Sequence, residues 1–192
     1  MKKINEIFYS VQGEGLHAGR PAHFIRFSGC NLHCPFCDTK HEEGVMMTDE
    51  EILEKINFGS NMVVLTGGEP SLFIDEQFIR KLNNLGKYVC IETNGTHELP
   101  KGKFFVTLSP KFEFVSKAEL KIKRASELKV VWNGKNNMYK YSDIVAKHRF
   151  IQPCDTQDKE KNAQIMQEVV EYVKEHPEWR VSVQTQKILN VR

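Results

Sequence analysis

Three of the chain's five cysteines lie within eight residues, in the stretch Cys30-Asn31-Leu32-His33-Cys34-Pro35-Phe36-Cys37. Thiolates are soft ligands that suit zinc, copper(I) and iron-sulfur clusters, and gaps of three and two residues let one short loop surround a single metal centre. Structural zinc sites and ordinary electron-transfer clusters have four protein ligands. Because three thiolates on a four-iron cluster leave one iron open to an outside molecule, the spacing indicates a cluster that takes part in chemistry.

Two other uses of these cysteines are weaker. A Cys3His zinc site would take His33 or His41 as its fourth ligand, but zinc knuckles usually combine two ligand pairs, and no second Cys-x2-Cys or His-x3-His follows in the sequence. A disulfide framework is disfavoured because the number of cysteines is odd and a chain of 192 residues can bury a core without cross-links. We expect Cys90, in an apolar stretch, and Cys154 not to be metal ligands.

The composition limits the partners. The chain has 27 basic and 25 acidic side chains, a net charge of +2, which is too balanced for a nucleic-acid or membrane-surface protein and favours a small substrate. The first residues contain no apolar signal-peptide core, and no apolar run approaches the length of a transmembrane span. We therefore expect one domain over residues 1–192, without a membrane or nucleic-acid partner, in the reducing cytoplasm, where thiols and clusters persist.

Strands and helices alternate along the sequence. Apolar stretches predict strands at residues 22–27, 61–66, 87–92, 104–108, 128–132, 149–151 and 180–185. Helices are predicted after the capping box at Thr48, over 74–85, and over 162–174, where Met166, Val169, Val170 and Val173 form a core stripe. This alternation predicts an α/β fold with parallel strands. Since the chain is short for a complete eightfold barrel, we expect a partial, open (β/α) barrel.

Polar motifs follow the predicted strands, so their residues should meet at the carboxyl edge of the sheet. Gly67-Gly68-Glu69-Pro70 follows one strand and offers a carboxylate suited to an amino-acid ammonium group, with a plain turn as the alternative. In Gln12-Gly13-Glu14-Gly15, the glycines allow close approach to a ligand, with a surface hairpin turn as the alternative. Arg26, four residues before Cys30, can pair with a ligand carboxylate, although a lone strand arginine is usually solvated.

The cysteine spacing, with an aromatic residue before the last cysteine, resembles the cluster loop of radical S-adenosylmethionine (radical SAM) enzymes. Over nearly the whole chain the motifs are similar to those of the 7-carboxy-7-deazaguanine synthase family. The motifs that carry this resemblance are Ser10-Val11-Gln12-Gly13-Glu14-Gly15, Arg26-Phe27-Ser28-Gly29-Cys30-Asn31-Leu32, Cys34-Pro35-Phe36-Cys37-Asp38-Thr39, Thr66-Gly67-Gly68-Glu69-Pro70, Glu92-Thr93-Asn94-Gly95-Thr96, Ser109-Pro110-Lys111 and Gln152-Pro153.

The resemblance implies an activity. It implies a homodimeric lyase that converts 6-carboxy-5,6,7,8-tetrahydropterin to 7-carboxy-7-deazaguanine with loss of ammonia, on the route to queuosine. It implies a 4Fe-4S cluster on Cys30, Cys34 and Cys37 that binds SAM at its open iron, an external electron donor such as flavodoxin, and Mg²⁺. A 5′-deoxyadenosyl radical would remove a hydrogen atom from the substrate, and the hydrogen would return to regenerate SAM.

The resemblance also implies site residues. Those expected at the substrate are Val11, Gln12, Gly13, Glu14, Arg26 at its carboxylate, Thr93 and the terminal residue Arg192. Those expected at SAM are the Phe36, Cys37 and Asp38 backbone with Gly68, Glu69, Gly95, Ser109, Pro110, Lys111, Gln152, Pro153, Cys154 and Asp155. Thr39 would ligate Mg²⁺, a hard cation that accepts hydroxyl, substrate and water oxygens.

One segment departs from the family pattern. The family tail often reads Gln-x-His-Lys, whereas this chain has Gln184-Thr185-Gln186-Lys187, so an uncharged amide stands in place of the histidine. Two rival functions remain. A glycyl-radical-activating enzyme would share the cluster and Gly-Gly-Glu-Pro but would not need Gln12, Glu14 or Thr39, and a zinc-stabilised binding module would need no iron.

Overall fold

Nine strands form one sheet within the residues that the computed structural model describes, 1–37, 39, 43–116 and 118–192. The strands are β1 (Lys2–Val11), β2 (Pro21–Phe27), β3 (Val45–Met47), β4 (Met62–Gly67), β5 (Tyr88–Thr93), β6 (Phe105–Leu108), β7 (Arg124–Trp132), β8 (Val145–Pro153) and β9 (Arg180–Val181). The helices are α1 (Asp49–Lys55), α2 (Glu76–Asn84), α3 (Lys159–Glu175) and α4 (Thr185–Leu189), with 3-10 turns at Gly15–His17, Pro70–Leu72 and Met138–Tyr141.

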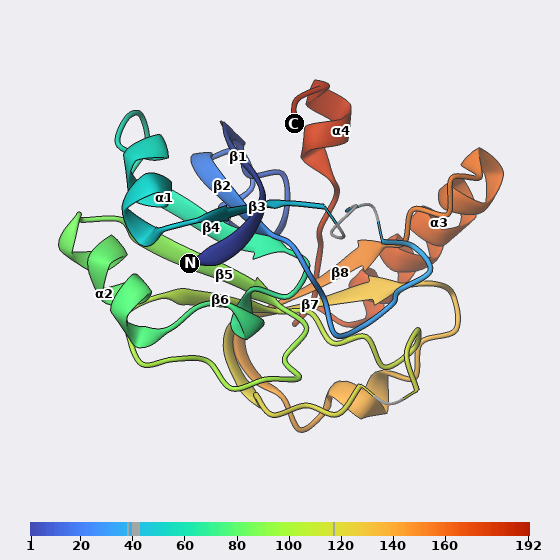
Figure 1. Cartoon of the computed structure of the whole chain (residues 1–192). Coiled ribbons are helices and arrows are strands. Elements are labelled where there is room, and N and C mark those ends of the chain that lie inside the picture. The colour runs from blue at the N-terminus through green and yellow to red at the C-terminus, as the bar shows by residue number, and fades with distance from the viewer. Residues whose placement is uncertain (38, 40–42, 117) are drawn as a thin grey trace.

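The sheet is a partial barrel. Its order is β3-β1-β2-β4-β5-β6-β7-β8-β9, and every neighbouring pair from β2 to β9 is parallel. The two ends of the sheet, β3 and β9, are not paired, so the curved sheet stays open (Figure 1). The expected open α/β barrel is therefore confirmed. The sequence did not predict that β1 adds to β2 and β3 in antiparallel fashion.

The helices begin where local hydrogen bonding predicts. At α1, the Glu51 backbone N–H donates to Thr48 Oγ1 (3.2 Å) and the Thr48 N–H donates to Glu51 Oε2 (2.7 Å), which is the predicted capping box. Asp75 accepts from the Phe78 N–H at the start of α2. Side chains thus accept hydrogen bonds from three backbone N–H groups at the helix starts that have no partner inside the helices. None of the described helices is long and apolar enough to cross a membrane.

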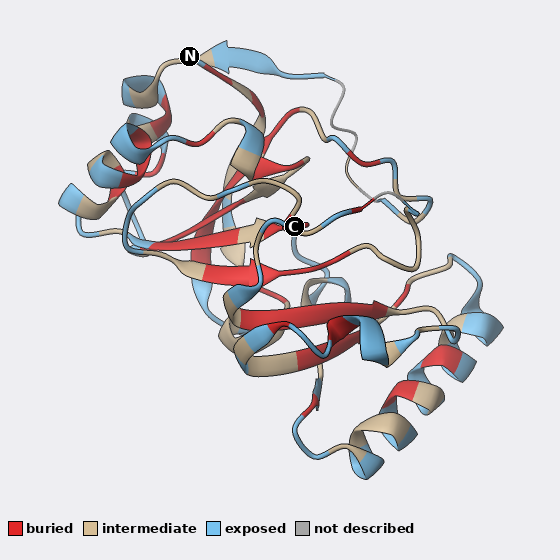
Figure 2. Cartoon of the chain, turned by 90° about the horizontal axis from the view of Figure 1, so that it is seen from below, coloured by how far each residue is buried: buried red, intermediate tan, exposed pale blue. Residues whose placement is uncertain are grey.

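The two faces of the sheet bury different kinds of side chain. On the outer face, alternate residues of β2, β4 and β5 pack against α1 and α2, and those of β7 and β8 pack against α3 (Figure 2). On the inner face, Ala22, Phe24, Met62, Val64 and Cys90 form an apolar floor. Side chains on one face of a strand recur at every second residue. The next inward-pointing residue of each of these strands therefore lies two positions closer to the carboxyl edge, and it is polar. The floor therefore closes the barrel below a polar site.

Two predicted details are wrong. The strand predicted over 180–185 ends at Val181, because Ser182 turns to the interior to bond with Gln152, and the Thr185 N–H donates to Gly13 O. In α3, Met166 and Val170 are exposed, and the buried stripe contains Ile165 and Val169. The predicted stripe is therefore confirmed at Val169 and Val173 and wrong at Met166 and Val170.

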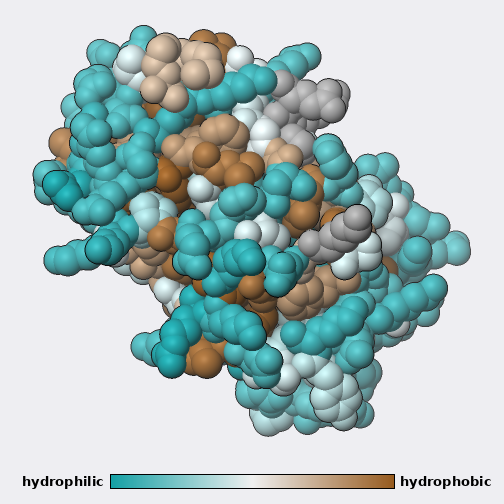
Figure 3. Space-filling view, turned by 60° about the horizontal axis from the view of Figure 1, so that its bottom comes forward, coloured by the Kyte–Doolittle hydropathy of each residue, from teal (hydrophilic) through white to brown (hydrophobic). Residues whose placement is uncertain are grey.

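The surface has a mixed character. On the face seen in Figure 3, hydrophilic side chains predominate, with apolar ones visible between them near the middle. The chain also carries nearly equal numbers of basic and acidic residues.

Candidate active site

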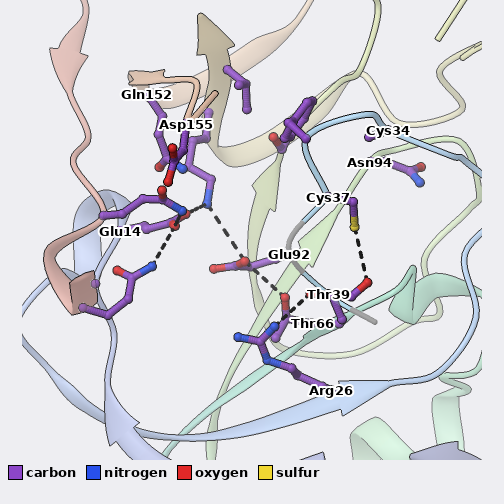
Figure 4. A pocket seen from close by; sticks show the side chains of 18 of the residues that line it. Glu14, Arg26, Cys34, Cys37, Thr39, Thr66, Glu92, Asn94, Gln152 and Asp155 are labelled. Carbon is purple, nitrogen blue, oxygen red and sulfur yellow. Dashed lines mark hydrogen bonds and ion pairs between the residues drawn. The ribbon is translucent and has the colours of Figure 1, made fainter. Parts of the chain in front are cut away.

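A cavity of about 360 Å³ opens at the carboxyl ends of the parallel strands (Figure 4). It collects most of the residues that the sequence predicts for the site: Val11, Gln12, Gly13, Glu14, Arg26, Cys30, Cys34, Phe36, Cys37, Thr39, Gly68, Glu69, Thr93, Ser109, Lys111, Gln152, Pro153, Cys154, Asp155 and Arg192. Gly95 and Pro110 are not among its lining residues, and Asp38 lies outside the described residues. The fold thus brings together residues from β1 to the segment after α4.

The cysteine loop leaves β2 at a glycine. Gly29 has a φ of +109°, a conformation open mainly to glycine, and it turns the chain towards the cavity. Cys30 and Cys34 are half-buried, Cys37 is exposed, and all three thiols are free. Burial raises the pKa of the thiols of Cys30 and Cys34 above the ordinary value. Both thiols would have to lose their protons to bind a metal, because a cysteine binds metal as the thiolate.

The arrangement of the thiols fits a cluster better than a single ion. Among the described residues, no three His, Cys, Asp or Glu side chains are placed to hold one metal ion. His33 is exposed, and His41 lies outside the described residues, so the Cys3His zinc site finds no support in this geometry. In a four-iron cluster each thiolate binds a different iron, so the three sulfur atoms need not converge on one point. Three free thiols lining one cavity match that requirement.

The turn after β4 packs directly on the cysteine loop. The Glu69 N–H donates to Gly29 O (2.9 Å), and a Cβ on Gly68 would lie only 2.0 Å from that oxygen. Gly67 adopts a φ of +104°. Both glycines of the motif are therefore required by this close approach of two backbones. The contact fixes the turn beside the thiols.

Glu69 is held in one orientation. Its buried carboxylate accepts hydrogen bonds from the Thr93 hydroxyl (2.6 Å), the Asn94 N–H (2.7 Å) and the Ser71 N–H (3.1 Å). A carboxylate has about four acceptor positions, so a position remains for an outside donor. The Thr93 hydroxyl donates to Glu69 and accepts from the Gly95 N–H. These two hydrogen bonds link the motifs that follow β4 and β5.

A lysine and an aspartate also line the cavity. Lys111 Nζ donates to Ser109 O and to Ser109 Oγ (2.7 Å each), and burial lowers the pKa of Lys111. Hydrogen bonds from Lys187, the Gln157 N–H and Asn162 lower the pKa of Asp155 to about 2. Asp155 is therefore ionised near neutral pH, and both side chains are anchored by hydrogen bonds to their neighbours.

Two guanidinium groups lie beside β1. Arg26 Nη1 donates to Thr39 Oγ1 (2.9 Å), and Arg26 Nε forms an ion pair with Glu6 (3.2 Å). Arg192 also pairs with Glu6, and both guanidinium groups lie over the Phe8 ring, at 5.6 Å for Arg26 and 5.0 Å for Arg192. The cavity wall is therefore cationic at this place, which suits an anionic group of a ligand.

A buried charge network forms the base of the cavity. The ammonium group of Lys129 contacts Glu14 directly and lies 3.9 Å from Glu92. Glu92 also accepts from Gln12 Nε2 (3.0 Å) and Thr66 Oγ1 (3.2 Å). Burial would raise the pKa of Glu14, but the charge and hydrogen bond of Lys129, with hydrogen bonds from two glutamines, lower it to about 2. The two carboxylates share one cation.

Several lining residues were missed by the sequence reasoning. They are Thr66, Glu92, Asn94, Lys129, Gln184, Gln186 and Lys187. Lys129 had a detectable signal, because a lysine inside the apolar run of residues 128–132 is unusual for a buried strand. Gln186, noted only as a departure from the family pattern, donates to Glu14 Oε1 (3.1 Å).

Comparisons with known proteins agree with this site. Residues 24–109 match the model of the radical SAM superfamily. The chain is 50% identical to the 7-carboxy-7-deazaguanine synthase of Bacteroides thetaiotaomicron, with 100% of both chains covered, and 34% identical to that of Burkholderia multivorans, with 98% of each covered. The crystal structure of QueE from Escherichia coli has a TM-score of 0.76 at 28% identity and covers 96% of this chain and 94% of that one. Streptococcus suis SuiB bound to S-adenosylmethionine has a TM-score of 0.50 at 15% identity, covers 80% of this chain and 44% of that one, and shares the fold alone.

Proposed function

The chain belongs to the 7-carboxy-7-deazaguanine synthase family of the radical SAM superfamily, and we propose that it converts 6-carboxy-5,6,7,8-tetrahydropterin to 7-carboxy-7-deazaguanine and ammonia. This reaction is a ring contraction that serves queuosine biosynthesis. The observation that carries the proposal is the single cavity in which the three thiols of the cysteine loop lie with Arg26 and Glu14. A cluster alone would suit any radical SAM enzyme, whereas this cavity also offers partners for an acidic pterin.

The cysteine side of the cavity would hold the cofactors. Cys30, Cys34 and Cys37 would each bind one iron of a 4Fe-4S cluster, and Glu69 with Gly68 would hold the amino-acid end of SAM. When bound, the cluster and SAM supply the one-electron cleavage of a carbon-sulfur bond and a radical that removes hydrogen from the substrate. The protein's part is to orient SAM, through carboxylate and backbone contacts, towards the base of the cavity.

The other side would hold the substrate. Arg26 would pair with its carboxylate, and the carboxylate of Glu14 would accept an N–H group of the pterin ring at the acceptor position that Lys129, Gln184 and Gln186 leave open. Both residues are fixed by neighbours before a ligand arrives, Arg26 by Thr39 and Glu6, and Glu14 by Lys129. Such preorganisation reduces the ordering needed when the substrate binds.

Mg²⁺ would bind at Thr39. The Thr39 hydroxyl accepts from Arg26 Nη1 at 2.9 Å, so the proposed cation site adjoins the guanidinium proposed for the substrate carboxylate. A carboxylate oxygen between them would meet two cations, and water would complete the octahedral shell that Mg²⁺ prefers. We also propose one domain over residues 1–192, a homodimer, a cytoplasmic location and an external electron donor such as flavodoxin.

The experiment is an anaerobic assay of reconstituted protein with dithionite, SAM, Mg²⁺ and the carboxytetrahydropterin. Mass spectrometry should detect 7-carboxy-7-deazaguanine, which should be absent when SAM or the pterin is omitted. An intact cluster that cleaves SAM but leaves the pterin untouched would contradict the substrate and favour a glycyl-radical-activating enzyme. Zinc in place of iron and sulfide would favour the binding module.

A further inference from the structure

Lys129 occupies an unusual position for a lysine. It lies in the middle of β7 with only 5% of its surface exposed, and neighbouring strand residues Leu128 and Val130 are fully buried on the opposite face. A lysine is almost never buried to this extent unless it is paired. Its partners here come from distant parts of the chain, since Glu14 follows β1 and Glu92 belongs to β5.

The lysine separates two carboxylates that would otherwise repel each other. Glu14 is in direct contact with the ammonium group, and Glu92 lies 3.9 Å from it. Burial would lower the pKa of Lys129, but the charges of Glu14 and Glu92 raise it above the ordinary value. The ammonium group therefore stays charged throughout the neutral range, and Glu14 stays ionised with it.

The remaining contacts hold the two carboxylates in place in the cavity wall. Glu14 is further held by the side-chain amides of Gln184 and Gln186 (3.1 Å each), and Glu92 by Gln12 and Thr66. Glu14, Glu92 and Lys129 all line the cavity. A planar heterocycle with N–H donors on its ring would find acceptors fixed in advance at the base of the site.

We propose that Lys129 is a positioning residue for the pterin: its ammonium group holds the carboxylates of Glu14 and Glu92 in the orientation in which they accept the N–H groups of the ring. This inference rests on the proposed function. Glu14 is the residue through which Lys129 acts most strongly, because the two are in direct contact. The lysine sets substrate affinity and takes no part in SAM cleavage.

A merely structural role is the competing explanation, and Lys2 provides its control. Lys2 is also buried, at 6% exposure, and its ammonium group also pairs with two carboxylates, Asp49 (2.7 Å) and Asp75 (3.3 Å). Neither Lys2 nor its partners line the cavity. Lys2→Met therefore removes an equivalent buried cation without touching the site.

The test measures KM for the pterin, kcat, and SAM cleavage without pterin in the reconstituted holoenzyme. Lys129→Met should raise KM at least about tenfold, with kcat and pterin-free SAM cleavage within about threefold of the wild type. Lys2→Met should leave KM unchanged. In the Glu14→Gln background, Lys129→Met should raise KM by less than about threefold, because its target is already removed. If Lys129→Met does not fold, this double variant is compared with Glu14→Gln alone.

Different results overturn different claims. A wild-type enzyme that makes no 7-carboxy-7-deazaguanine overturns the proposed function and this inference with it. With an active wild type, an unchanged KM in Lys129→Met overturns the inference alone. An equal rise of KM in the wild-type and Glu14→Gln backgrounds would mean that Lys129 does not act through Glu14, and it also overturns the inference.

Discussion

Cys34 and Cys90 are both free thiols, but they lie in different surroundings. Cys34 lines the cavity beside Cys30 and Cys37, whereas Cys90 is packed in the apolar floor below it. Burial raises the pKa of Cys90 to about 12, as for an inert thiol that serves only packing. The function of a cysteine in this chain is therefore decided by its place in the barrel.

We predict that Cys34→Ala loses the intact cluster and all SAM cleavage, because one iron would lack its thiolate. Iron and sulfide content and 5′-deoxyadenosine formation measure this. The matched control is Cys90→Ala, which should keep both and lose about 1–2 kcal/mol of unfolding free energy through the small cavity it leaves. Normal SAM cleavage in Cys34→Ala would refute the ligand assignment.

Arg26→Ala should raise the KM for the pterin about 10- to 100-fold, because a charge-assisted contact with the substrate carboxylate is lost. SAM affinity should change less than about twofold, since the Arg26 side chain contacts Thr39 and Glu6, neither of which is proposed to hold SAM. Steady-state kinetics and SAM binding measure the two effects. Arg149→Ala is the control, because this arginine stacks on Trp179 away from the cavity. Equal losses for pterin and SAM would argue against a substrate role.

At the scale of elements, the loop between β1 and β2 is joined to the far side of the barrel. The Leu16 N–H donates to Glu127 (2.9 Å) on β7, and the Gly15 N–H donates to Ser182 Oγ (3.0 Å) after β9. Gly15 has a φ of +64°, and a Cβ there would lie 2.3 Å from Glu127 Oε1. The glycine therefore lets the loop approach the sheet, and Glu14 reaches Lys129 from it.

This connection predicts an acid-dependent stability. The pKa of Glu14 is about 2 in the fold, below the value of 4.5 for a free glutamate, so its contribution is complete above pH 4.5 and is lost as the pH falls towards 2. Glu14→Gln should lower the unfolding free energy by roughly 1–3 kcal/mol near neutral pH, and the difference from wild type should shrink below about pH 4. Urea unfolding of cluster-free protein measures it.

The control for this prediction is Asp143→Asn, because Asp143 is 80% exposed and pairs with Lys123 at 3.8 Å. Such a surface pair contributes little, so this variant should follow the wild type at every pH. A constant difference between wild type and Glu14→Gln across the acid range would contradict the predicted ion pair.

The sequence predicted those elements whose cause is local. The capping box at Thr48 and the strand over residues 22–27 depend on neighbouring residues, and both are observed. The end of the last strand depends on Ser182 and Thr185 meeting Gln152 and Gly13, which are distant in sequence, so a β-like pattern was overridden by tertiary contacts.

The candidate site, too, has parts that the sequence predicted and parts that depend on contacts between residues distant in sequence. Motifs at strand ends were predicted to meet, because parallel strands share one carboxyl edge, and the cavity collects them. The network of Lys129 could not be predicted, because its partner Glu14 is 115 residues away and only the register of the whole sheet brings them together. The sign that the sequence did offer was Lys129 itself, a charged residue within an apolar strand.

At the scale of the whole molecule, the cavity depends on the complete sheet. Its lining residues extend from Phe8 to Arg192, and they come from the antiparallel strand β1, from parallel strands of the sheet and from the loops that follow them. They include the thiols and the Glu69 carboxylate as well as Arg26, Glu14 and Lys129. In the proposed function, the barrel would bring cofactor and substrate together in this one cavity, which is what hydrogen transfer between two bound molecules needs.

The most direct test of this account is the stoichiometry of one anaerobic reaction, with 7-carboxy-7-deazaguanine, ammonia and 5′-deoxyadenosine all quantified. We predict that product and ammonia form in equal amounts and exceed the SAM supplied, because hydrogen returns to regenerate SAM. Accumulation of 5′-deoxyadenosine without product or ammonia would contradict the account, since SAM would then be consumed by a reaction other than ring contraction of the pterin.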